Sequence, residues 1–144
     1  MANKEIEKFA IWTVDSEYIK IILNSLRNRI SNNEVLSIIC GAEYGTLINQ
    51  LNELCEYAST ETEVTWLSER FVEMHKCILD DLSLLVDSNS LKNSHSWELG
   101  NRKIACERLL EAYRGFKLRD EDTEALIEKC LETLTSICKE VKAC

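Results

Sequence analysis

Apolar residues recur along most of the chain at steps of three and four, the spacing that lines up one face of an α-helix. In the longest such run the steps are four, three, four, four and three. Its members are Leu67, Phe71, Met74, Ile78, Leu82 and Leu85. No run of β-branched and aromatic residues alternates with polar ones between turn signals, as a half-buried strand requires. The pattern therefore predicts an all-α protein with this helix as its spine.

Capping signals divide the pattern into about seven helices. Residues 31–34 (Ser-Asn-Asn-Glu) and 60–63 (Thr-Glu-Thr-Glu) each match a capping box, in which two side chains satisfy amides at a helix start. Asp15 or Ser16 is expected to cap a second helix that follows a short first one. Gly41 is expected to end a short third helix, because glycine tolerates the left-handed conformation found after helix ends.

The same signals place the later helices. Thr46 is expected to open the fourth helix and Ser96 to cap the sixth, which ends at Gly115. Acidic residues at 120–122 favour the start of a seventh helix, where the helix dipole stabilises negative charge. Residues 87–96 are polar and are predicted to form a mobile loop between the fifth and sixth helices.

Composition places these helices in one soluble domain that spans residues 1–144. No residue is proline, which helices exclude and loops accept, and 45% of the residues are hydrophobic. The longest stretch without Asp, Glu, Lys or Arg covers residues 44–52, far short of the roughly 20 apolar residues of a membrane span. The charged N-terminus is unlike a signal peptide, so we expect a cytoplasmic or nuclear protein without membrane contact. Packing as a globular bundle and packing as stacked helical hairpins both stay open.

Cysteine and histidine positions do not match the usual metal sites. The seven cysteines, at positions 40, 55, 77, 106, 130, 138 and 144, include no closely spaced ligand pair, and the chain has only two histidines. Most of these cysteines fall in or beside apolar runs, where a thiol behaves as a small hydrophobe in a reducing compartment. We therefore predict no metal and no cofactor.

Each catalytic template that we tested lacks a part. Glu53 and Glu56 share a helix face, a spacing also used by all-helical, magnesium-dependent nucleotide pyrophosphohydrolases, but no later Glu-x-x-Asp completes the set. His75 and Cys77 lie two residues apart on a helix, so their side chains diverge and cannot act as a base and nucleophile. The four glycines do not cluster into a phosphate-binding loop. The sequence therefore predicts no catalytic residue.

Charge is distributed unevenly along the chain. The net charge of −8 disfavours nucleic acid as a partner. Residues 102–119 nevertheless contain six basic and two acidic side chains, and Glu124, Glu128 and Glu132 follow on one helix face. Two explanations stay open: the sixth and seventh helices pair as an antiparallel hairpin, or the acidic face docks a basic partner.

Aromatic residues near helix ends supply a second candidate partner surface. Trp97, Tyr113, Arg114 and Phe116 lie on or beside the sixth helix. Tryptophan, tyrosine and arginine dominate the hot spots of protein interfaces. Core or cap packing is the alternative role for these side chains.

Two resemblances bear on architecture. Successive amphipathic helices joined by short turns resemble the helix pairs of HEAT and armadillo arrays, which bind partners along a concave face. Residues 96–102 (Ser-Trp-Glu-Leu-Gly-Asn-Arg) form a segment similar to the Asn-Trp-Gly-Arg segment of apoptosis regulators, helical bundles with a groove for an amphipathic helix. Here two residues separate the tryptophan from the glycine and we expect no C-terminal anchor like that family's, so no functional residue is carried over.

These observations predict a non-catalytic, intracellular adaptor or regulatory domain that binds another protein. The partner is expected to lay an amphipathic or basic segment against a helical groove or a charged helix face. A small enzyme that uses clustered carboxylates is a second possibility. Its candidate residues are Glu53, Glu56, Asp80 and Asp81. An apoptosis-regulator-like bundle and a homodimer that associates through an apolar patch also stay open.

Overall fold

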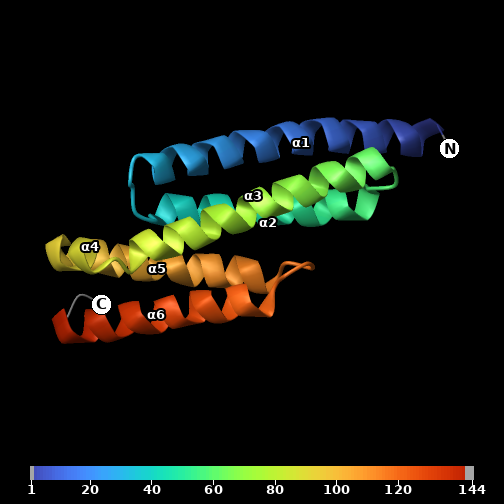
Figure 1. Cartoon of the computed structure of the whole chain (residues 1–144). Coiled ribbons are helices and arrows are strands. Elements are labelled where there is room, and N and C mark those ends of the chain that lie inside the picture. Colours follow the sequence, from blue (N-terminus) through green and yellow to red (C-terminus); the bar gives the residue numbers. More distant parts are fainter. Residues whose placement is uncertain (1, 142–144) are drawn as a thin grey trace.

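The computed structural model describes the backbone of residues 2–141 and the side chains of residues 7–141. Within this range the chain forms six helices and no strand, so the all-α prediction is confirmed with a helix count close to the expected seven. The helices, labelled in Figure 1, are α1 (Ala2–Ser31), α2 (Ile38–Tyr57), α3 (Glu61–Leu85), α4 (Ser88–Asn93), α5 (Ser96–Arg114) and α6 (Glu121–Val141).

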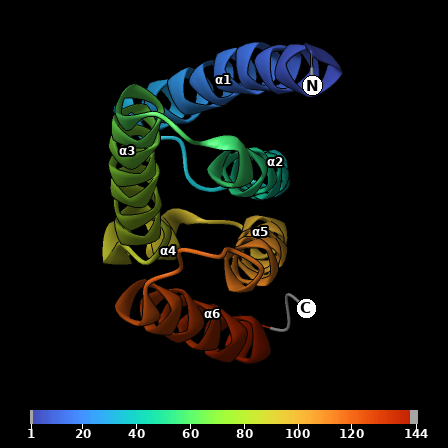
Figure 2. The same cartoon turned by 90° about the vertical axis from the view of Figure 1, so that its right-hand side faces the viewer.

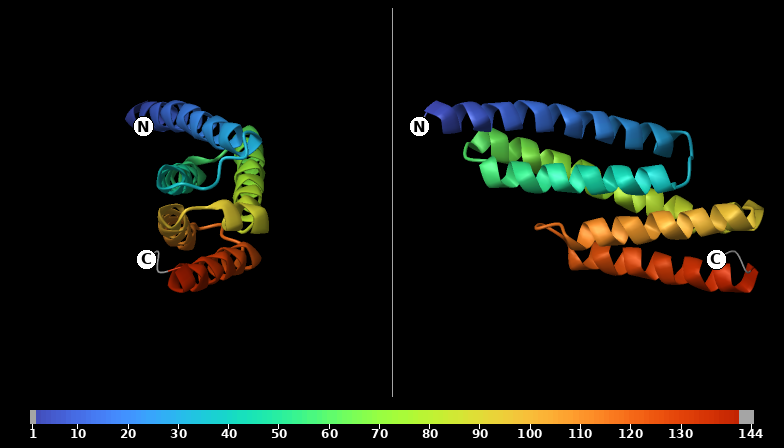
Figure 3. Two further views of the ribbon diagram at one scale, coloured as in Figure 1. Left: turned by 90° about the vertical axis from the view of Figure 1, so that its left-hand side faces the viewer. Right: turned by 180° about the vertical axis from the view of Figure 1, so that it is seen from behind.

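The helices pack into one bundle around a central pair, α2 and α5. These two helices run side by side in the same direction, because α3 carries the chain back between them (Figure 1). Helix α1 packs on the outer side of α2 and α6 on the outer side of α5, as the rear view in Figure 3 shows. Helix α3 crosses one side of this row, and Figure 2 shows it spanning from α1 toward α6. Of the two expected packings, the globular bundle is therefore the observed one.

The start of α3 confirms the second capping box. The Thr60 hydroxyl accepts a hydrogen bond from the Glu63 amide at 3.2 Å, and the Glu63 carboxylate accepts one from the Thr60 amide at 3.1 Å. Burial disfavours the charged form of Glu63, but hydrogen bonds from Ser59, Thr60 and Lys8 outweigh it and lower its pKa to about 2. This local signal sets the helix start without help from distant residues.

The predicted break at Asp15 or Ser16 is wrong, because α1 continues through both residues. The Asp15 side chain is buried against α2 instead of capping a helix. With its amide nitrogen turned inward, Gln50 of α2 donates to both Asp15 carboxylate oxygens, at 2.7 and 2.8 Å. Burial, and then the neighbouring Glu53, raise the pKa of Asp15.

The first capping box is also wrong, because the Ser-Asn-Asn-Glu segment ends a helix instead of starting one. Asn33 has a positive φ of 56°, and the Glu34 amide donates to the Arg29 carbonyl at 2.8 Å. This is the Schellman ending, with asparagine in the place that glycine usually takes. The next helix is capped by Ser37, whose hydroxyl accepts from the Cys40 amide at 3.3 Å.

Gly41 does not end a helix, and the expected third and fourth helices form the single helix α2, which also contains Thr46. A methyl group added at Gly41 would lie 2.9 Å from the Ala105 carbonyl oxygen of α5. Real Cβ atoms do not approach a backbone oxygen so closely. The glycine is therefore needed for the contact between two helices and not for a turn.

The later boundaries differ from expectation in small ways. Residues 87–96 contain α4, which Asp87 caps by accepting from the Ser90 amide at 3.1 Å, and the mobility of this segment stays a prediction. Ser96 is the first residue of α5, after His95 at the cap position. Gly115 does follow the last residue of α5, but with a φ of −82° it does not adopt the left-handed conformation.

Cysteine side chains contribute to the packing between the helices. Those at 40, 77, 106, 130 and 138 are buried and Cys55 is half-buried, as expected for small apolar residues. Position 144 lies outside the described residues. None of the helices described here is long and apolar enough to cross a membrane.

The close contact of Gly41 with α5 leads to a testable prediction, for which Gly45 of the same helix supplies the control. Gly41→Ala is expected to destabilise the protein by about 1–3 kcal/mol through overpacking. Gly45→Ala, one turn further along α2, places its methyl group 3.7 Å from its nearest neighbour, the Ala112 Cβ. This control is expected to stabilise the helix by up to about 1 kcal/mol. Urea unfolding measures both changes, and equal effects would contradict the close approach.

Candidate functional site: an apolar groove

An open groove of about 620 Å³ lies between the end of α2, the first half of α3 and the connection from α5 to α6. Its lining is Leu51, Cys55, Ala58, Val64, Leu67, Ser68, Phe71, Val72, Phe116, Leu118 and Arg119. Val64 is 52% exposed, Val72 65% and Leu118 52%, so three apolar side chains face solvent. Apolar side chains exposed together and rimmed by polar residues mark binding sites on soluble proteins.

Packed aromatic rings hold the base of the groove in place. The rings of Phe71 on α3 and Phe116 in the connection lie 5.4 Å apart, and Tyr113 contacts Phe116 at 6.1 Å between ring centroids. Phe116 and Tyr113 are fully buried. Such tilted ring pairs add to the free energy gained by burying apolar area. The floor of the groove is therefore part of the core.

Hydrogen bonds from the Asn52 side chain of α2, which we call the Asn52 clasp, hold the connection between α5 and α6. This connection forms one wall of the groove. The Asn52 amide nitrogen donates to the Gly115 carbonyl at 3.2 Å, and its oxygen accepts from the Lys117 amide at 3.1 Å. The Lys117 ammonium also pairs with the Glu56 carboxylate. Because these contacts tie a loop to a helix, the groove has a preformed shape.

A partly buried hydrogen-bond chain holds the other end of the connection. The Tyr113 hydroxyl accepts from the Asp120 amide at 2.8 Å and lies 2.9 Å from Nε2 of His75. Nδ1 of His75 lies 3.0 Å from the Phe71 carbonyl, which can only accept. We therefore assign the proton to Nδ1, so that Nε2 accepts from Tyr113. The Asp120 carboxylate then caps α6 by accepting from the Thr123 amide at 3.1 Å.

The electrostatics of the groove set which ligands fit. Burial raises the pKa of the Cys55 thiol, although Lys117 lowers it in part, so Cys55 is neutral at pH 7. Arg119 is the one charged residue of the described lining. Exposed carboxylates lie near lining residues in the sequence: Glu61 comes three residues before Val64, and Glu121 and Asp122 follow shortly after Arg119. The lining itself is apolar apart from Ser68, Arg119 and the Cys55 thiol.

The four residues that were expected to form an aromatic surface do not lie together on one surface. Tyr113 and Phe116 are buried, so they support the groove instead of presenting a free face. Trp97 is 64% exposed and stacks on His95 at the opposite end of α5 from Tyr113. Arg114 points to α6 and pairs there with acidic side chains. Only Phe116 belongs to the lining of the groove.

The acidic face of α6 is partly accounted for inside the bundle. An Arg114 Nη2 donates to Glu128 at 2.7 Å, and Nε lies 3.7 Å from Glu124. These contacts join α5 and α6 as the hairpin explanation predicted. Glu132 is exposed and lines a shallow surface hollow between the same two helices. Docking of a basic partner on this face stays a prediction.

The carboxylates considered for an enzyme lie in different environments. Glu56 pairs with Lys117, and Glu53 lies beside Asp15. Asp80 is exposed, whereas its neighbour Asp81 is 2% exposed and accepts a hydrogen bond from the buried Tyr44 hydroxyl. Between residues 7 and 141 no three histidine, cysteine or acidic side chains come together as a metal site.

Comparison with protein families, curated proteins and solved structures finds no match to this chain. The resemblances to helical arrays and to apoptosis regulators therefore remain resemblances of pattern.

Most groove residues were missed at the sequence level, although one signal pointed to them. Val72 lies off the core stripe of α3, whereas Val64, three residues before Leu67, continues that stripe. An apolar residue outside the core stripe indicates a second apolar surface beside it. The partners from α2 and the connection are distant in sequence and carry no such signal.

The buried Asp81 carboxyl group is expected to make the free energy of unfolding depend on pH. Burial raises its pKa from 3.8 to about 6, although the Tyr44 hydrogen bond lowers it. The folded state then binds this proton more tightly than the unfolded state does. Stability from this group is present below about pH 4 and is lost, by about 2–3 kcal/mol, as pH rises through about 6.

Asp81→Asn keeps an oxygen that accepts from Tyr44 and removes the titration. Its free energy of unfolding, measured in denaturant between about pH 4 and pH 7, is expected to fall less with rising pH than that of the wild type. Parallel profiles for the two proteins would contradict the raised pKa.

Proposed function

We propose that this protein is a non-catalytic interaction domain whose groove binds an amphipathic helix of a partner protein. The observation that carries the proposal is the open groove of about 620 Å³ with Val64, Val72 and Leu118 exposed along it. Helix-in-groove recognition uses apolar anchors spaced along one helix face. The groove supplies a matching apolar strip between two helices and a pinned connection.

Net charge favours one kind of helix. The whole chain carries a net charge of −8, and Glu61, Glu121 and Asp122 are exposed and close in sequence to the lining residues Val64 and Arg119. Complementary charges speed association and disfavour wrong partners. The partner helix is therefore one with leucine-type anchors on one face and lysine or arginine on its flanks. Arg119 adds a single position for an acidic or carbonyl group of the same helix.

A preformed site lowers the cost of binding. The Asn52 clasp and the Tyr113 chain order the connection before any partner arrives. Ordering a loop during association costs free energy, and this cost is avoided when the loop is already ordered in the free protein. The thiols that the structure describes also suit a reducing compartment such as the cytoplasm or nucleus.

Binding of a designed peptide tests the proposal. The probe is a fluorescent helical peptide with leucines on one face and lysines on the flanks, followed by anisotropy. Val72→Gln with Leu118→Gln places two amides in the apolar strip without changing the net charge. We expect the affinity to fall at least about tenfold, because buried amides lose hydrogen bonds to water.

Ile39→Gln is the matched control, since Ile39 is an exposed apolar residue at the start of α2 and outside the groove. It is expected to leave affinity unchanged. Equal binding by the groove variant, or equal affinity for a glutamate-flanked peptide, would contradict the proposal. A concentration-dependent dimer that the groove variant abolishes would assign the groove to a second copy of the chain instead.

A further inference from the structure

A single arginine without an acidic partner lies among the apolar residues of the groove. Arg119 lines the groove and is exposed, and it forms no ion pair with any carboxylate between residues 7 and 141. Its one hydrogen bond there runs from Nη1 to the Phe116 carbonyl at 3.4 Å. By contrast, Arg70 and Arg114 are paired with glutamates. The Arg119 guanidinium therefore keeps N–H donors that a ligand in the groove can reach.

The backbone next to Arg119 is held at one end of the groove. The amide of the following residue, Asp120, donates to the Tyr113 hydroxyl, which lies 2.9 Å from Nε2 of His75 on α3. Val64, in the first turn of α3, precedes His75 by about 16 Å along the helix axis. Arg119 therefore marks the end of the groove away from Val64.

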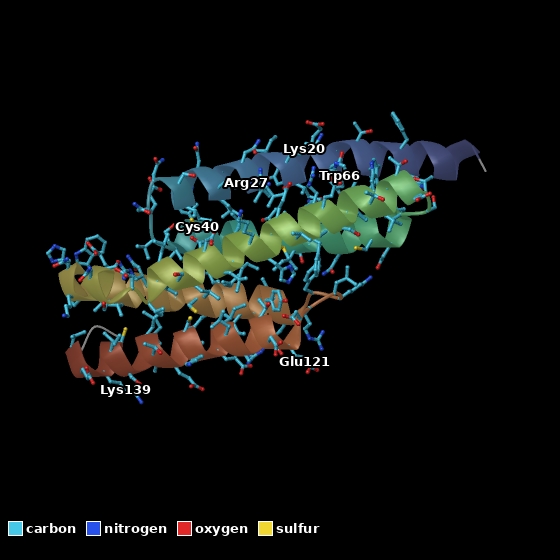
Figure 4. The ribbon with its side chains drawn as sticks, in the orientation of Figure 1. Lys20, Arg27, Cys40, Trp66, Glu121 and Lys139 are labelled. Carbon is cyan, nitrogen blue, oxygen red and sulfur yellow. The ribbon has the colours of Figure 1, made fainter. Side chains whose placement is uncertain are left out.

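The two ends of the groove differ in charge. Figure 4 shows Trp66, two residues after Val64, well separated from Glu121, two residues after Arg119. At the first end the lining consists of uncharged residues such as Ala58, which follows α2, and Val64. The positive charge of the described lining lies at the second end alone. A ligand that is itself polar along its length therefore has a preferred direction in the groove.

On the basis of the proposed function, we infer that the partner helix binds with its C-terminal end at Arg119. The last four carbonyls of a helix have no partner within the helix, and the helix dipole makes that end negative. A guanidinium offers five N–H donors to these carbonyls, or to the terminal carboxylate of a chain that ends there. The opposite direction would place the positive end of the dipole against a cation. Arg119 is therefore the residue that determines the direction of the bound helix.

The length of the groove limits how far the partner helix extends past its apolar anchors. A span of about 16 Å holds about three helical turns, enough for anchors at positions i, i+4 and i+7. The carbonyls of the helix end reach Arg119 when the helix stops within about one turn of its last anchor. A partner segment of about eleven residues therefore fills the groove.

The fluorescent, lysine-flanked helical peptide tests this inference when it is made in two forms that end within one turn of the last leucine. One form has a free C-terminal carboxylate and the other a C-terminal amide. Arg119→Gln removes the cation, and its affinity for the carboxylate form is expected to be about three- to tenfold lower than that of the wild type. A loss confined to the carboxylate form identifies the terminal carboxylate as the bound group, and an equal loss for both forms identifies the main-chain carbonyls.

Arg108→Gln is the matched control. Arg108 is also an exposed arginine without an ion pair between residues 7 and 141, and it lies on α5 outside the lining of the groove. Both substitutions change the net charge by the same amount, so any general attraction of the lysines to the protein changes equally. The control is expected to bind both forms as the wild type does.

Nuclear magnetic resonance with a nitroxide label on the peptide measures the direction of the bound helix. A label near the C-terminus is expected to broaden the amide signal of Leu118 more than that of Val64, and a label near the N-terminus is expected to do the reverse. Unchanged affinity of Arg119→Gln for both forms, or the opposite pattern of broadening, would overturn the inference and leave the proposed function standing. Failure of the wild type to bind either form would instead refute both.

Discussion

The close approach of α2 to α5 is the constraint on which the rest of the bundle depends. At Gly41 there is no room for a side chain between the two helices, because the Ala105 carbonyl oxygen occupies that space. Parallel helices in direct contact need a connection that returns the chain along their length, and α3 provides it (Figure 1). Helix α1 packs on α2 and α6 packs on α5, whereas α3 contacts α1, α2 and α6.

The same arrangement produces the groove. Helix α3 lies against the row of helices instead of within it (Figure 2). Its first half packs on α1, where the rings of Trp12 and Trp66 lie 5.9 Å apart, and meets the end of α2 and the connection after α5 at the groove. That connection is too short to cover Val64 and Val72, and its own Leu118 is exposed beside them. Tyr113 at the end of α5 and Phe116 in the connection are buried in the core. The exposed apolar side chains of Val64, Val72 and Leu118 are therefore left uncovered by these rings.

How much could be predicted depends on whether a signal is local. The Thr60 capping box was predictable because both of its partners lie within one turn. The predictions for Asp15 and Gly41 were wrong because distant residues set their roles. Asp15 contacts Gln50 of α2, and Gly41 lies against Ala105 of α5. An acid that can cap a helix also serves as a buried acceptor, and a glycine that can end a helix also permits close packing. Burial is likewise a tertiary property, so the sequence could not show that Tyr113 and Phe116, two of the candidate interface residues, lie in the core.

The most direct test of the central claim is nuclear magnetic resonance mapping of the backbone amides during titration with the lysine-flanked helical peptide. The account predicts saturable shifts concentrated at Cys55, Val64, Val72 and Leu118, with α4 and the last turns of α6 unaffected. Shifts confined to another face, such as the exposed side of α1, or the absence of any saturable shift, would contradict it.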